Sequence, residues 1–406
     1  METPALWLLP FAALLLSIAV LPLTVPVRWG RPGFQALVAG LAALPVAFGR
    51  PGALGHVVPE YLSFVLLLGS LYVVTSGIRI TGDIPARPAT NVGLLAIGGL
   101  LASIIGTTGA SMLLIRLVLE VNSERKNVSH TVLFFILVVS NVGGCLTPLG
   151  DPPLFLGYLA GVPFFWTLRL VRVWALALAA LLGTYFLVER RRYAAEPREA
   201  IRADETTRRP IRISGRWNLP LLCGIVAATA FLEAPYREAA YLLSAALSFP
   251  LTPRKQRTET GFSWHPILEV AILFAGIFVT MEPALAVLRE RAPMLGFTRP
   301  WQFFWATGAL SACLDNAPTY AAFLALARGL GRPEVAGVPA KILEAISTGA
   351  VFFGALTYIG NGPNFLVRSI AVSRGVAMPS FFGFAARAAA VLLPLFVLIT
   401  FVFFRG

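Results

Sequence analysis

The sequence predicts an all-α polytopic membrane protein with about ten transmembrane helices and two re-entrant hairpins, arranged as two inverted-topology repeats. The composition, the lengths of the apolar segments and an internal repeat lead to this prediction. Of the 406 residues, 57% are hydrophobic and only 13% are charged, and the mean hydropathy is +0.76. A soluble domain carries about 25% charged residues. The chain is therefore not a soluble enzyme, a secreted disulfide scaffold or a disordered protein.

Several apolar segments are long enough to cross the ~30 Å hydrocarbon layer, which takes about 20 helical residues. Two other apolar stretches, 91–121 and 299–327, are interrupted by polar tips at 106–109 and 315–318. Half-helices around such a tip cannot each cross, so we expect two re-entrant hairpins, which are tolerated only inside protein or beside a water-filled cavity. The expected full crossings are 5–26, 33–49, 58–77, 131–156, 163–188, 218–233, 236–251, 266–283, 340–366 and 379–404.

The basic residues lie mainly in the short connections between these segments, and they indicate the topology. Cytoplasmic loops collect Lys and Arg, and the connection 189–217 contains nine basic residues. We expect a multi-pass protein of the inner membrane, with 189–217 and 252–264 in the cytoplasm. The net charge of +13 does not indicate a nucleic-acid partner, because the basic residues form no aromatic-interleaved face. The order of the crossings places these further loops on the cytoplasmic side: 27–32, 78–90 and 122–130.

The sequence supports four further, smaller predictions. Residues 1–27 lack a basic n-region and are interpreted as a retained first span rather than a signal peptide. Lys341 and Glu344 are expected to form an ion pair at i,i+3, and His130 is expected to lie at the membrane interface. The cysteines have no CxxC spacing, so they are expected to pack as small residues rather than form a disulfide or metal framework. They are Cys145, Cys223 and Cys313.

An internal repeat relates the two parts of the chain. Residues 146–156 and 356–366 agree at seven of eleven positions, with Asp and Asn counted as equal, at an offset of 210. Upstream, residues 106–112 align with 314–320 at an offset of 208. Each half then holds five crossings and one hairpin. Because five is odd, the second half must enter the membrane in the opposite sense. Inverted repeats with discontinuous helices are typical of secondary transporters.

This repeat predicts the organisation of the chain. A first inverted repeat covers 1–188, a basic cytoplasmic loop covers 189–217, and a second inverted repeat covers 218–406. Each repeat carries one hairpin and one broken helix. They are 91–121, dipping in from the cytoplasm, with 131–156 in the first repeat, and 299–327 with 340–366 in the second.

The two hairpin tips and the two helix interruptions, 147–153 and 357–364, are expected to converge. Gly and Pro there free backbone groups from helical pairing, and freed carbonyls and helix ends can hold ions near the membrane midplane. The alternative is that these residues only kink helices for packing. The expected ion- or substrate-binding residues are Thr107, Thr108, Ser111, Asn141, Thr147, Gly150, Asp151, Asp315, Asn316, Thr319, Thr357, Gly360, Asn361 and Asn364.

Asp151 and Asp315 are the main candidates, because a carboxylate at membrane depth costs about 2.5–3.5 kcal/mol. Each is expected to titrate or to pair with a cation. The repeat partner of Asp151 is Asn361, so the halves differ in charge. Asp315 has an alternative role as the N-cap of the returning half-helix. A Na⁺ ion is expected at Asp151, Asp315, Asn316 and Asn361.

Residues 140–156, 314–319 and 357–364 resemble the ion transporter superfamily. That group contains D-type sodium:proton antiporters, citrate–metal and dicarboxylate symporters, and the arsenite pump. The most similar branch is labelled citrate transporters or sodium:proton antiporters, and the likeness spans about 58–390. The resemblance implies a homodimer with a scaffold and a transport domain that moves as an elevator.

The hairpin tips depart from the dicarboxylate symporters, which carry Ser-Asn-Thr at both tips. Here the tips read Thr-Thr-Gly from 107 and Asp-Asn-Ala from 315. A carboxylate at 315 repels a dianion unless a cation lies between them. This departure favours Na⁺/H⁺ exchange over citrate uptake.

The sequence therefore predicts an ion-coupled secondary transporter, a sodium/proton antiporter working by elevator-type alternating access. A Na⁺- or H⁺-coupled citrate or dicarboxylate symporter is the alternative. An intramembrane aspartyl protease using Asp151 and Asp315, and a passive channel, are remote ones. No cofactor is expected beyond Na⁺ and H⁺ as transported or coupling ions. The expected partners are the lipid bilayer, a second copy of the chain, and a small inorganic cation or carboxylate solute.

Overall fold

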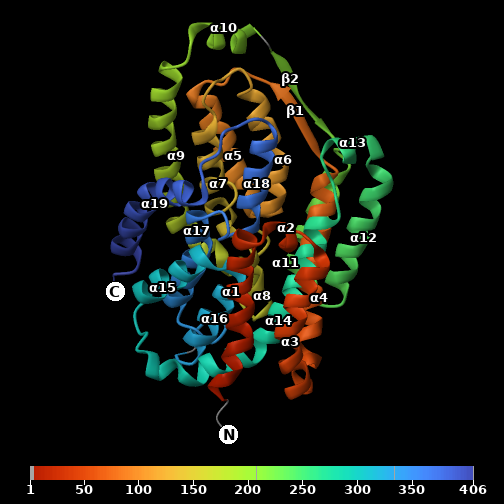
Figure 1. Cartoon of the computed structure of the whole chain (residues 1–406), viewed down its shortest axis with the longest axis vertical. Helices are drawn as coiled ribbons and strands as arrows, with labels where there is room; N and C mark the ends of the chain where they lie inside the picture. The colour runs from red at the N-terminus through yellow and green to blue at the C-terminus, as the bar shows by residue number, and fades with distance from the viewer. Residues whose placement is uncertain (1–3, 207, 333, 406) are drawn as a thin grey trace.

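Helices form most of the chain in this computed structural model, which describes residues 4–206, 208–332 and 334–405 (Figure 1). The prediction of an all-α polytopic membrane protein is confirmed, because eight helical stretches of the described ranges are long and apolar enough to cross a membrane. They are Ala5–Thr24, Pro32–Gly49, Leu54–Ser76, Pro88–Ile105, Ser129–Leu146, Phe164–Ala194, His265–Leu295 and Phe381–Phe403.

The elements follow one another in two runs. The first run consists of η1 (Ala5–Trp7), α1 (Leu8–Thr24), α2 (Pro26–Trp29), α3 (Pro32–Gly49), η2 (Pro51–Ala53), α4 (Leu54–Ser76), β1 (Arg79–Asp83), α5 (Pro88–Ile105), α6 (Thr107–Val121), α7 (Ser129–Val138), η3 (Val142–Leu146), α8 (Pro152–Leu159), η4 (Phe164–Leu170) and α9 (Val171–Ala194). The second consists of α10 (Arg198–Thr206), β2 (Arg209–Ser214), α11 (Asn218–Phe231), α12 (Tyr236–Leu251), α13 (Arg254–Glu259), α14 (His265–Arg291), η5 (Ala292–Leu295), α15 (Pro300–Cys313), α16 (Asn316–Arg328), α17 (Ala340–Phe353), η6 (Gly354–Leu356), α18 (Gly362–Ser373) and α19 (Phe381–Phe403).

The segment 340–366 divides into α17 with 14 residues and α18 with 12, in line with the broken helix predicted there. Two of the expected unbroken crossings contain shorter helices than predicted. The segment 218–233 holds α11 with 14 residues, and 236–251 holds α12 with 16. At 1.5 Å per residue these two helices reach only about 21–24 Å, less than the ~30 Å hydrocarbon layer. Conversely, Pro88–Ile105 is long and apolar, although the sequence predicted it as one arm of a hairpin.

A two-stranded antiparallel sheet, which the sequence analysis did not predict, joins two of the basic loops. In this sheet β1 pairs with β2, with Arg79 opposite Ser214 and Asp83 opposite Arg209. Glu259 forms an ion pair with Arg79. Such contacts bring the segments 78–90, 189–217 and 252–264 together at one end of the molecule, and the cytoplasmic location of this end stays a prediction.

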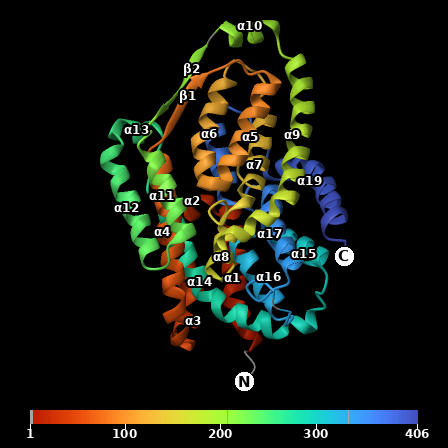
Figure 2. The ribbon, with the colours of Figure 1, turned by 180° about the vertical axis from the view of Figure 1, so that it is seen from behind.

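Two pairs of adjacent helices turn sharply at the expected tips. The pair α5 and α6 breaks at Gly106, which adopts the left-handed φ of +82°. The pair α15 and α16 breaks at Leu314 and Asp315, both of extended backbone. The first pair lies in the half of the molecule that carries α10, and the second pair lies in the opposite half (Figures 1 and 2).

Each interrupted helix runs between these two halves. From the first, α7 lies beside α5 and α9, and α8 packs on α16. From the second, α17 packs on α15 and α16, and α18 packs on α6. The far arm of each interrupted helix thus packs against the helix pair of the other half. The division into inverted repeats stays a prediction, and this crossed packing agrees with it.

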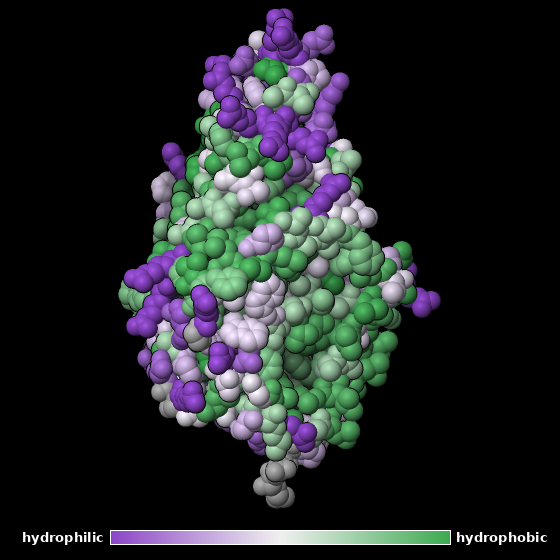
Figure 3. Space-filling view, turned by 90° about the vertical axis from the view of Figure 1, so that its left-hand side faces the viewer, coloured by the Kyte–Doolittle hydropathy of each residue, from purple (hydrophilic) through white to green (hydrophobic). Residues whose placement is uncertain are grey.

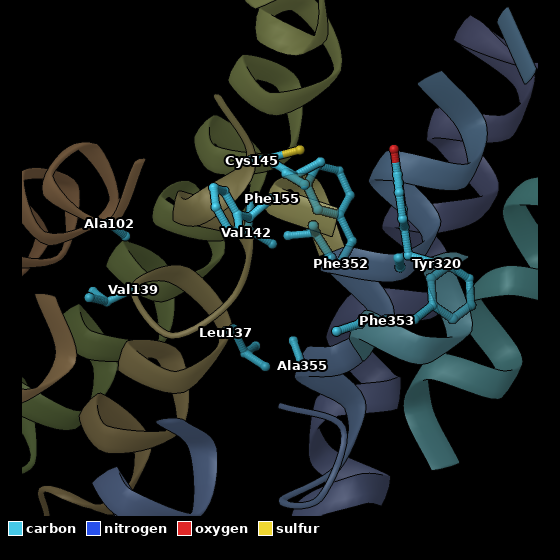
Figure 4. Close-up of a cluster of buried hydrophobic side chains, with 14 of the residues drawn as sticks. Ala102, Leu137, Val139, Val142, Cys145, Phe155, Tyr320, Phe352, Phe353 and Ala355 are labelled. Atoms are coloured by element: carbon cyan, nitrogen blue, oxygen red, sulfur yellow. The ribbon is translucent and has the colours of Figure 1, made fainter. Parts of the chain in front are cut away.

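Buried apolar side chains fill the space where the interrupted segments meet (Figure 4). The cysteines of this chain are free, and Cys145 is fully buried in this cluster, whereas Cys223 and Cys313 are exposed. Apolar burial stabilises such a junction by about 25 cal/mol per Å². The cluster includes Val142, Cys145, Phe155, Phe352, Phe353 and Ala355.

The surface is divided between polar ends and an apolar middle. Figure 3 shows hydrophilic residues gathered at the end that carries α10, and hydrophobic residues over much of the middle of that face. Many exposed large side chains on the long helices are apolar, including Leu16, Leu41, Ile97, Leu187 and Phe401. This pattern is that of a surface solvated by lipid.

Candidate functional site

Asp151 is buried inside the molecule, where the first interrupted helix resumes. It is the N-cap residue of α8 and has extended backbone, with φ −149° and ψ 143°. Pro152 and Pro153 follow it, and their missing N–H groups prevent the preceding helix from continuing through this point. The side chain is only 1% exposed. The local sequence therefore stops a helix and leaves a carboxylate deep inside the protein.

Three side chains from three other segments donate hydrogen bonds to this carboxylate. Thr107 Oγ1 donates to Oδ1 at 2.9 Å, and Asn361 Nδ2 donates to the same oxygen at 2.9 Å. Asn316 Nδ2 donates to Oδ2 at 2.7 Å. The Thr107 amide also donates to the carbonyl of Gly150 at 2.8 Å. Both helix tips and both interruptions thus meet at Asp151.

The charge of Asp151 is supported only by neutral groups. No Lys, Arg or His in the described part of the chain forms an ion pair with it. The helices α6, α8, α16 and α18 all begin at the site, and a helix N-terminus is equivalent to about half a positive charge. A buried carboxylate without a full counter-charge either binds a proton or attracts a cation. Asp151 is therefore a candidate for binding a proton or a cation.

The amides at the site leave oxygen atoms free. The Nδ2 groups of Asn316 and Asn361 point at Asp151, and no described residue donates to their Oδ1 atoms. A side-chain amide can present either end after a rotation. Oxygen atoms of this kind, beside a carboxylate, are ligands for a hard cation such as Na⁺.

A chain of amides joins the two interrupted segments behind Asp151. Asn361 Nδ2 also donates to the Ser140 carbonyl at 3.0 Å and to Asn141 Oδ1 at 3.3 Å. Asn141 Nδ2 donates to Asn364 Oδ1 at 2.7 Å. Asn364 Nδ2 in turn donates to the Gly354 carbonyl at 2.8 Å. Asn141 and Asn364 thus hold the unwound backbone and reach Asp151 only through Asn361.

Two threonines have equivalent roles in the two halves. Thr147 Oγ1 donates to the carbonyl of Ser103, near the end of α5. Thr357 Oγ1 donates to the carbonyl of Ala312, near the end of α15, at 2.7 Å. Neither hydroxyl contacts Asp151. Each instead ties an interruption to the adjacent helix tip.

Two pairs of glycines allow each interruption to fold back on itself. A Cβ on Gly150 would lie 2.1 Å from the Gly144 carbonyl oxygen, and one on Gly360 would lie 2.6 Å from that of Gly354. These distances are shorter than a real Cβ contact, so a side chain at either position displaces backbone. The roles of Gly150 and Gly360 are therefore steric in this structure.

Asp315 is half-buried and does not hydrogen-bond to Asp151. Its Oδ1 accepts from the Ala317 amide at 3.0 Å, which makes it the N-cap of α16. Thr319 Oγ1 donates to the Asp315 carbonyl at 2.9 Å. The side chain of Thr108 is half-buried and makes no hydrogen bond within the described ranges. The structure thus shows the capping role that was the alternative prediction for Asp315.

Ser111 pairs with a residue that the sequence analysis missed. Its hydroxyl lies 2.8 Å from that of Ser140, next to Asn141. Gly144 and Gly354 were also missed, although they match each other at the offset of 210 that relates Gly150 to Gly360. Extending the aligned segments two residues upstream is the signal that finds them.

A second buried polar cluster surrounds Glu189, which the sequence placed in a basic loop. Glu189 is fully buried at the end of α9 and forms an ion pair with Arg125. His130 Nε2 lies 2.5 Å from its Oε2, and Asn91 Nδ2 donates to its Oε1 at 3.0 Å. His130 is therefore part of an internal cluster rather than a simple interfacial residue. This cluster is separate from the hydrogen bonds around Asp151.

The ion pair between Lys341 and Glu344 is confirmed, with Nζ 2.7 Å from Oε2. Both lie at the start of α17, away from Asp151. The pair is a surface feature and contributes little to stability.

Comparison with known proteins gives one result for the whole chain. No individually curated protein matches it significantly. Residues 1–404 match the family described as "Putative citrate transport". That match covers nearly the whole length, including every residue of the Asp151 site, and the members are membrane transporters rather than enzymes. The chain therefore belongs to the family described as "Putative citrate transport", and it is a multi-pass secondary transporter.

Proposed function

We propose that this secondary transporter is a sodium/proton antiporter in which Na⁺ and H⁺ compete for Asp151. The observation that carries the proposal is a buried carboxylate at which both helix tips and both interruptions meet, and which accepts hydrogen bonds from neutral donors only. Bound Na⁺ or a bound proton each neutralises this charge. Because a bare charge is costly at membrane depth, the neutralised forms move between the two sides more readily than the empty one, and this difference couples the two ions.

Rotation of two side-chain amides lets the site bind either a proton or Na⁺. With Asp151 ionised, Asn316 and Asn361 donate N–H groups to it. With Asp151 protonated, its O–H needs an acceptor, and a rotated amide provides the Oδ1 atom. Na⁺ requires oxygen ligands, which the same rotation provides. The proposed order is protonation, release of Na⁺ on one side, reorientation, and binding of Na⁺ with release of the proton on the other side.

We also propose how the protein is organised and oriented in the membrane during this cycle. The helix pairs α5–α6 and α15–α16 are re-entrant hairpins of two inverted repeats, and they form part of the transport domain of an elevator-type carrier that works as a homodimer. The crossed packing of α8 on α16 and of α18 on α6 supports this grouping. The basic end with β1, β2 and α10 is the cytoplasmic end of a protein of the inner membrane, following the positive-inside rule.

A citrate or dicarboxylate symporter is the second candidate, and two observations favour it. The family is described by citrate transport. The convergence of helix N-termini also favours an anion. In that case Asp151 holds the coupling Na⁺ or H⁺, and the neutralised site accepts a carboxylate. An aspartyl protease is not supported, because such a dyad shares one proton between adjacent carboxylates, and Asp315 caps its own helix instead.

The test is exchange in proteoliposomes with an imposed Na⁺ gradient and an internal pH dye. Wild type should change the internal pH, whereas Asp151→Asn should not, because it removes the titrating charge and leaves the volume unchanged. The exchanged pair Asp151→Asn with Asn361→Asp should recover part of the activity, since the two side chains are 2.9 Å apart. The exposed Cys313→Ala, beside the tip, is the matched control.

Two outcomes contradict the proposal. Exchange by Asp151→Asn at the wild-type rate shows that the carboxylate does not carry the ions. Accumulation of labelled citrate that depends on a Na⁺ or H⁺ gradient, with no exchange in the absence of citrate, replaces antiport with the second candidate.

A further inference from the structure

A large basic cavity opens at the end of the molecule that carries β1 and β2. It has a volume of about 700 Å³ and adjoins a narrower pocket of about 50 Å³. The larger cavity lies between the C-terminal end of α6, the loop 122–129, and the turn 374–377 that follows α18. The narrower pocket extends inward between α4, β1 and α6 as far as Met112. None of the residues around Asp151 lines either cavity.

The charged side chains that line the large cavity are almost all basic: Arg79, Arg125, Lys126, Arg209 and Arg374, against Glu120 alone. Three of these cations have acidic partners. Arg79 pairs with Glu259, Arg125 pairs with Glu189, and Arg209 lies 3.6 Å from Glu120. Lys126 and Arg374 are exposed, and neither forms an ion pair within the described ranges. Two of the cations that line the cavity therefore have no ion-pair partner among the described residues.

A third cation without a carboxylate partner among the described residues lines the narrower pocket. Arg116 is half-buried, and its Nη1 donates to the backbone carbonyl of Glu259 at 2.9 Å rather than to a carboxylate. The positive charges of Arg374 and Arg79 repel that of Arg116. Positive charges held together in a partly enclosed space attract a counter-ion of opposite charge. Arg374 lines both spaces, so it can hold an anion with two or more negative charges together with Arg116 in the narrower pocket or with Lys126 in the larger cavity.

We propose that this basic cavity binds a small multivalent oxyanion, a polycarboxylate or a phosphate group, between α6 and α18 on one side and α4, β1 and α13 on the other. Arginine and lysine bind carboxylates and phosphates through charge-assisted hydrogen bonds. The same chemistry is offered by a free cytosolic anion and by the headgroup of an anionic lipid. A bound anion joins parts of the chain that otherwise repel through their cations. The proposal does not depend on which ion Asp151 carries.

The test uses the purified full-length protein in neutral detergent, with citrate and inorganic phosphate as calorimetric probes. Wild type should bind at least one of them with an affinity that falls as salt increases. Arg374→Gln and Lys126→Gln should each weaken binding about tenfold, the loss expected for one charged hydrogen bond. Arg198→Gln, an exposed arginine on α10 outside the cavity, is the matched control. Binding should persist in Asp151→Asn, which separates this site from the transport site.

A lipid arm distinguishes the two sources of the anion. Nanodiscs of phosphatidylcholine with added cardiolipin should retain cardiolipin on wild type and lose it in Arg374→Gln if the headgroup is the ligand. Ligand-free Arg374→Gln should be at least as thermostable as wild type, because a repulsion with Arg116 is removed, so lost binding is not unfolding. The proposal is overturned if neither probe nor cardiolipin binds, or if Arg198→Gln weakens binding as much as Arg374→Gln.

Discussion

Asp151 and Asn361 occupy equivalent positions in the two halves of the chain, and they touch each other. Asn361 Nδ2 donates to Asp151 Oδ1 at 2.9 Å. Two aspartates at this distance would repel strongly, because like charges in a buried site cannot both ionise. The Asp/Asn difference therefore leaves one titratable charge where two symmetric segments meet. One charge neutralised by one cation is the simplest basis for coupling.

Asp315 has a role that a pair of substitutions can separate from ion binding. Asparagine is as good an N-cap as aspartate, whereas alanine costs about 1 kcal/mol. Since Asp315 caps α16 and does not bond to Asp151, Asp315→Asn should keep both the thermal stability and most of the Na⁺-dependent exchange. Asp315→Ala should lower the unfolding temperature. Loss of exchange in a stable Asp315→Asn protein contradicts this prediction and makes its charge part of the ion site.

At the scale of elements, each interrupted helix depends on close approach of its own backbone. The loops from 144 to 150 and from 354 to 360 bring two glycines together, and a threonine hydroxyl then ties each loop to a neighbouring helix tip. The φ angles at these four glycines are not left-handed. Space, rather than backbone freedom, is what requires glycine there. The geometry around Asp151 follows from these contacts.

Alanine substitutions test the steric requirement. Gly150→Ala and Gly360→Ala place a Cβ 2.1 Å and 2.6 Å from a backbone oxygen, so each should destabilise the protein by at least the ~1–3 kcal/mol typical of overpacking. Gly362→Ala, two residues from Gly360, has no atom within 4 Å and should be neutral. Unfolding of the purified proteins by heat measures the difference. Equal stability of Gly360→Ala and Gly362→Ala contradicts the steric argument.

At the scale of the whole molecule, the basic end is a connected layer rather than a set of free loops. The strands β1 and β2 pair, and Asp204 of α10 accepts from the Ala86 amide through both carboxylate oxygens, at 3.1 and 3.0 Å. Asp83 is buried at the end of β1, where its oxygens accept no hydrogen bond from the described residues and Oδ2 lies 3.8 Å from Arg209 Nη2. This layer ties the start of α5 to the end of α9, across the first half of the chain.

Acidity should strengthen this layer. Burial raises the pKa of Asp83 and of Asp204 above the ordinary value of 3.8. An acid whose pKa is raised by folding binds its proton more tightly in the folded state, so its contribution to stability is fullest below 3.8 and falls as the pH rises through the raised pKa. Hydrogen exchange at Ala86 and β2, corrected for intrinsic rates, should therefore be slower at mildly acidic pH than at neutral pH.

Variants give the control for this pH dependence. Asp83→Asn with Asp204→Asn should remove most of it, because the two buried acids whose pKa is raised no longer titrate. Glu199→Gln, an exposed residue of α10, should retain it. A pH dependence that survives the double substitution assigns the effect to other groups.

Part of the fold and of the site could be predicted from local residues. Gly106, Pro152 with Pro153, and Gly362 with Pro363 end or start helices through their own backbone chemistry, and the breaks occur at these places. The alignment of the helix tips was off by one residue. The sequence alignment pairs Thr107 with Asp315. In the structure, Thr107 instead corresponds to Asn316, because each is the first residue of its helix and each donates a hydrogen bond to Asp151.

The sequence by itself determined that the chain lies in a membrane, that its helices are interrupted at repeated positions, and that few carboxylates lie at depth. These properties depend on composition and on neighbours along the chain. The tertiary structure alone decided which polar groups meet. Packing of segments 44, 165 and 210 residues from Asp151 chose three donors for it, turned Asp315 to its own helix, and buried Glu189. Local preference fixes where a helix stops, but only long-range packing fixes what its exposed end faces.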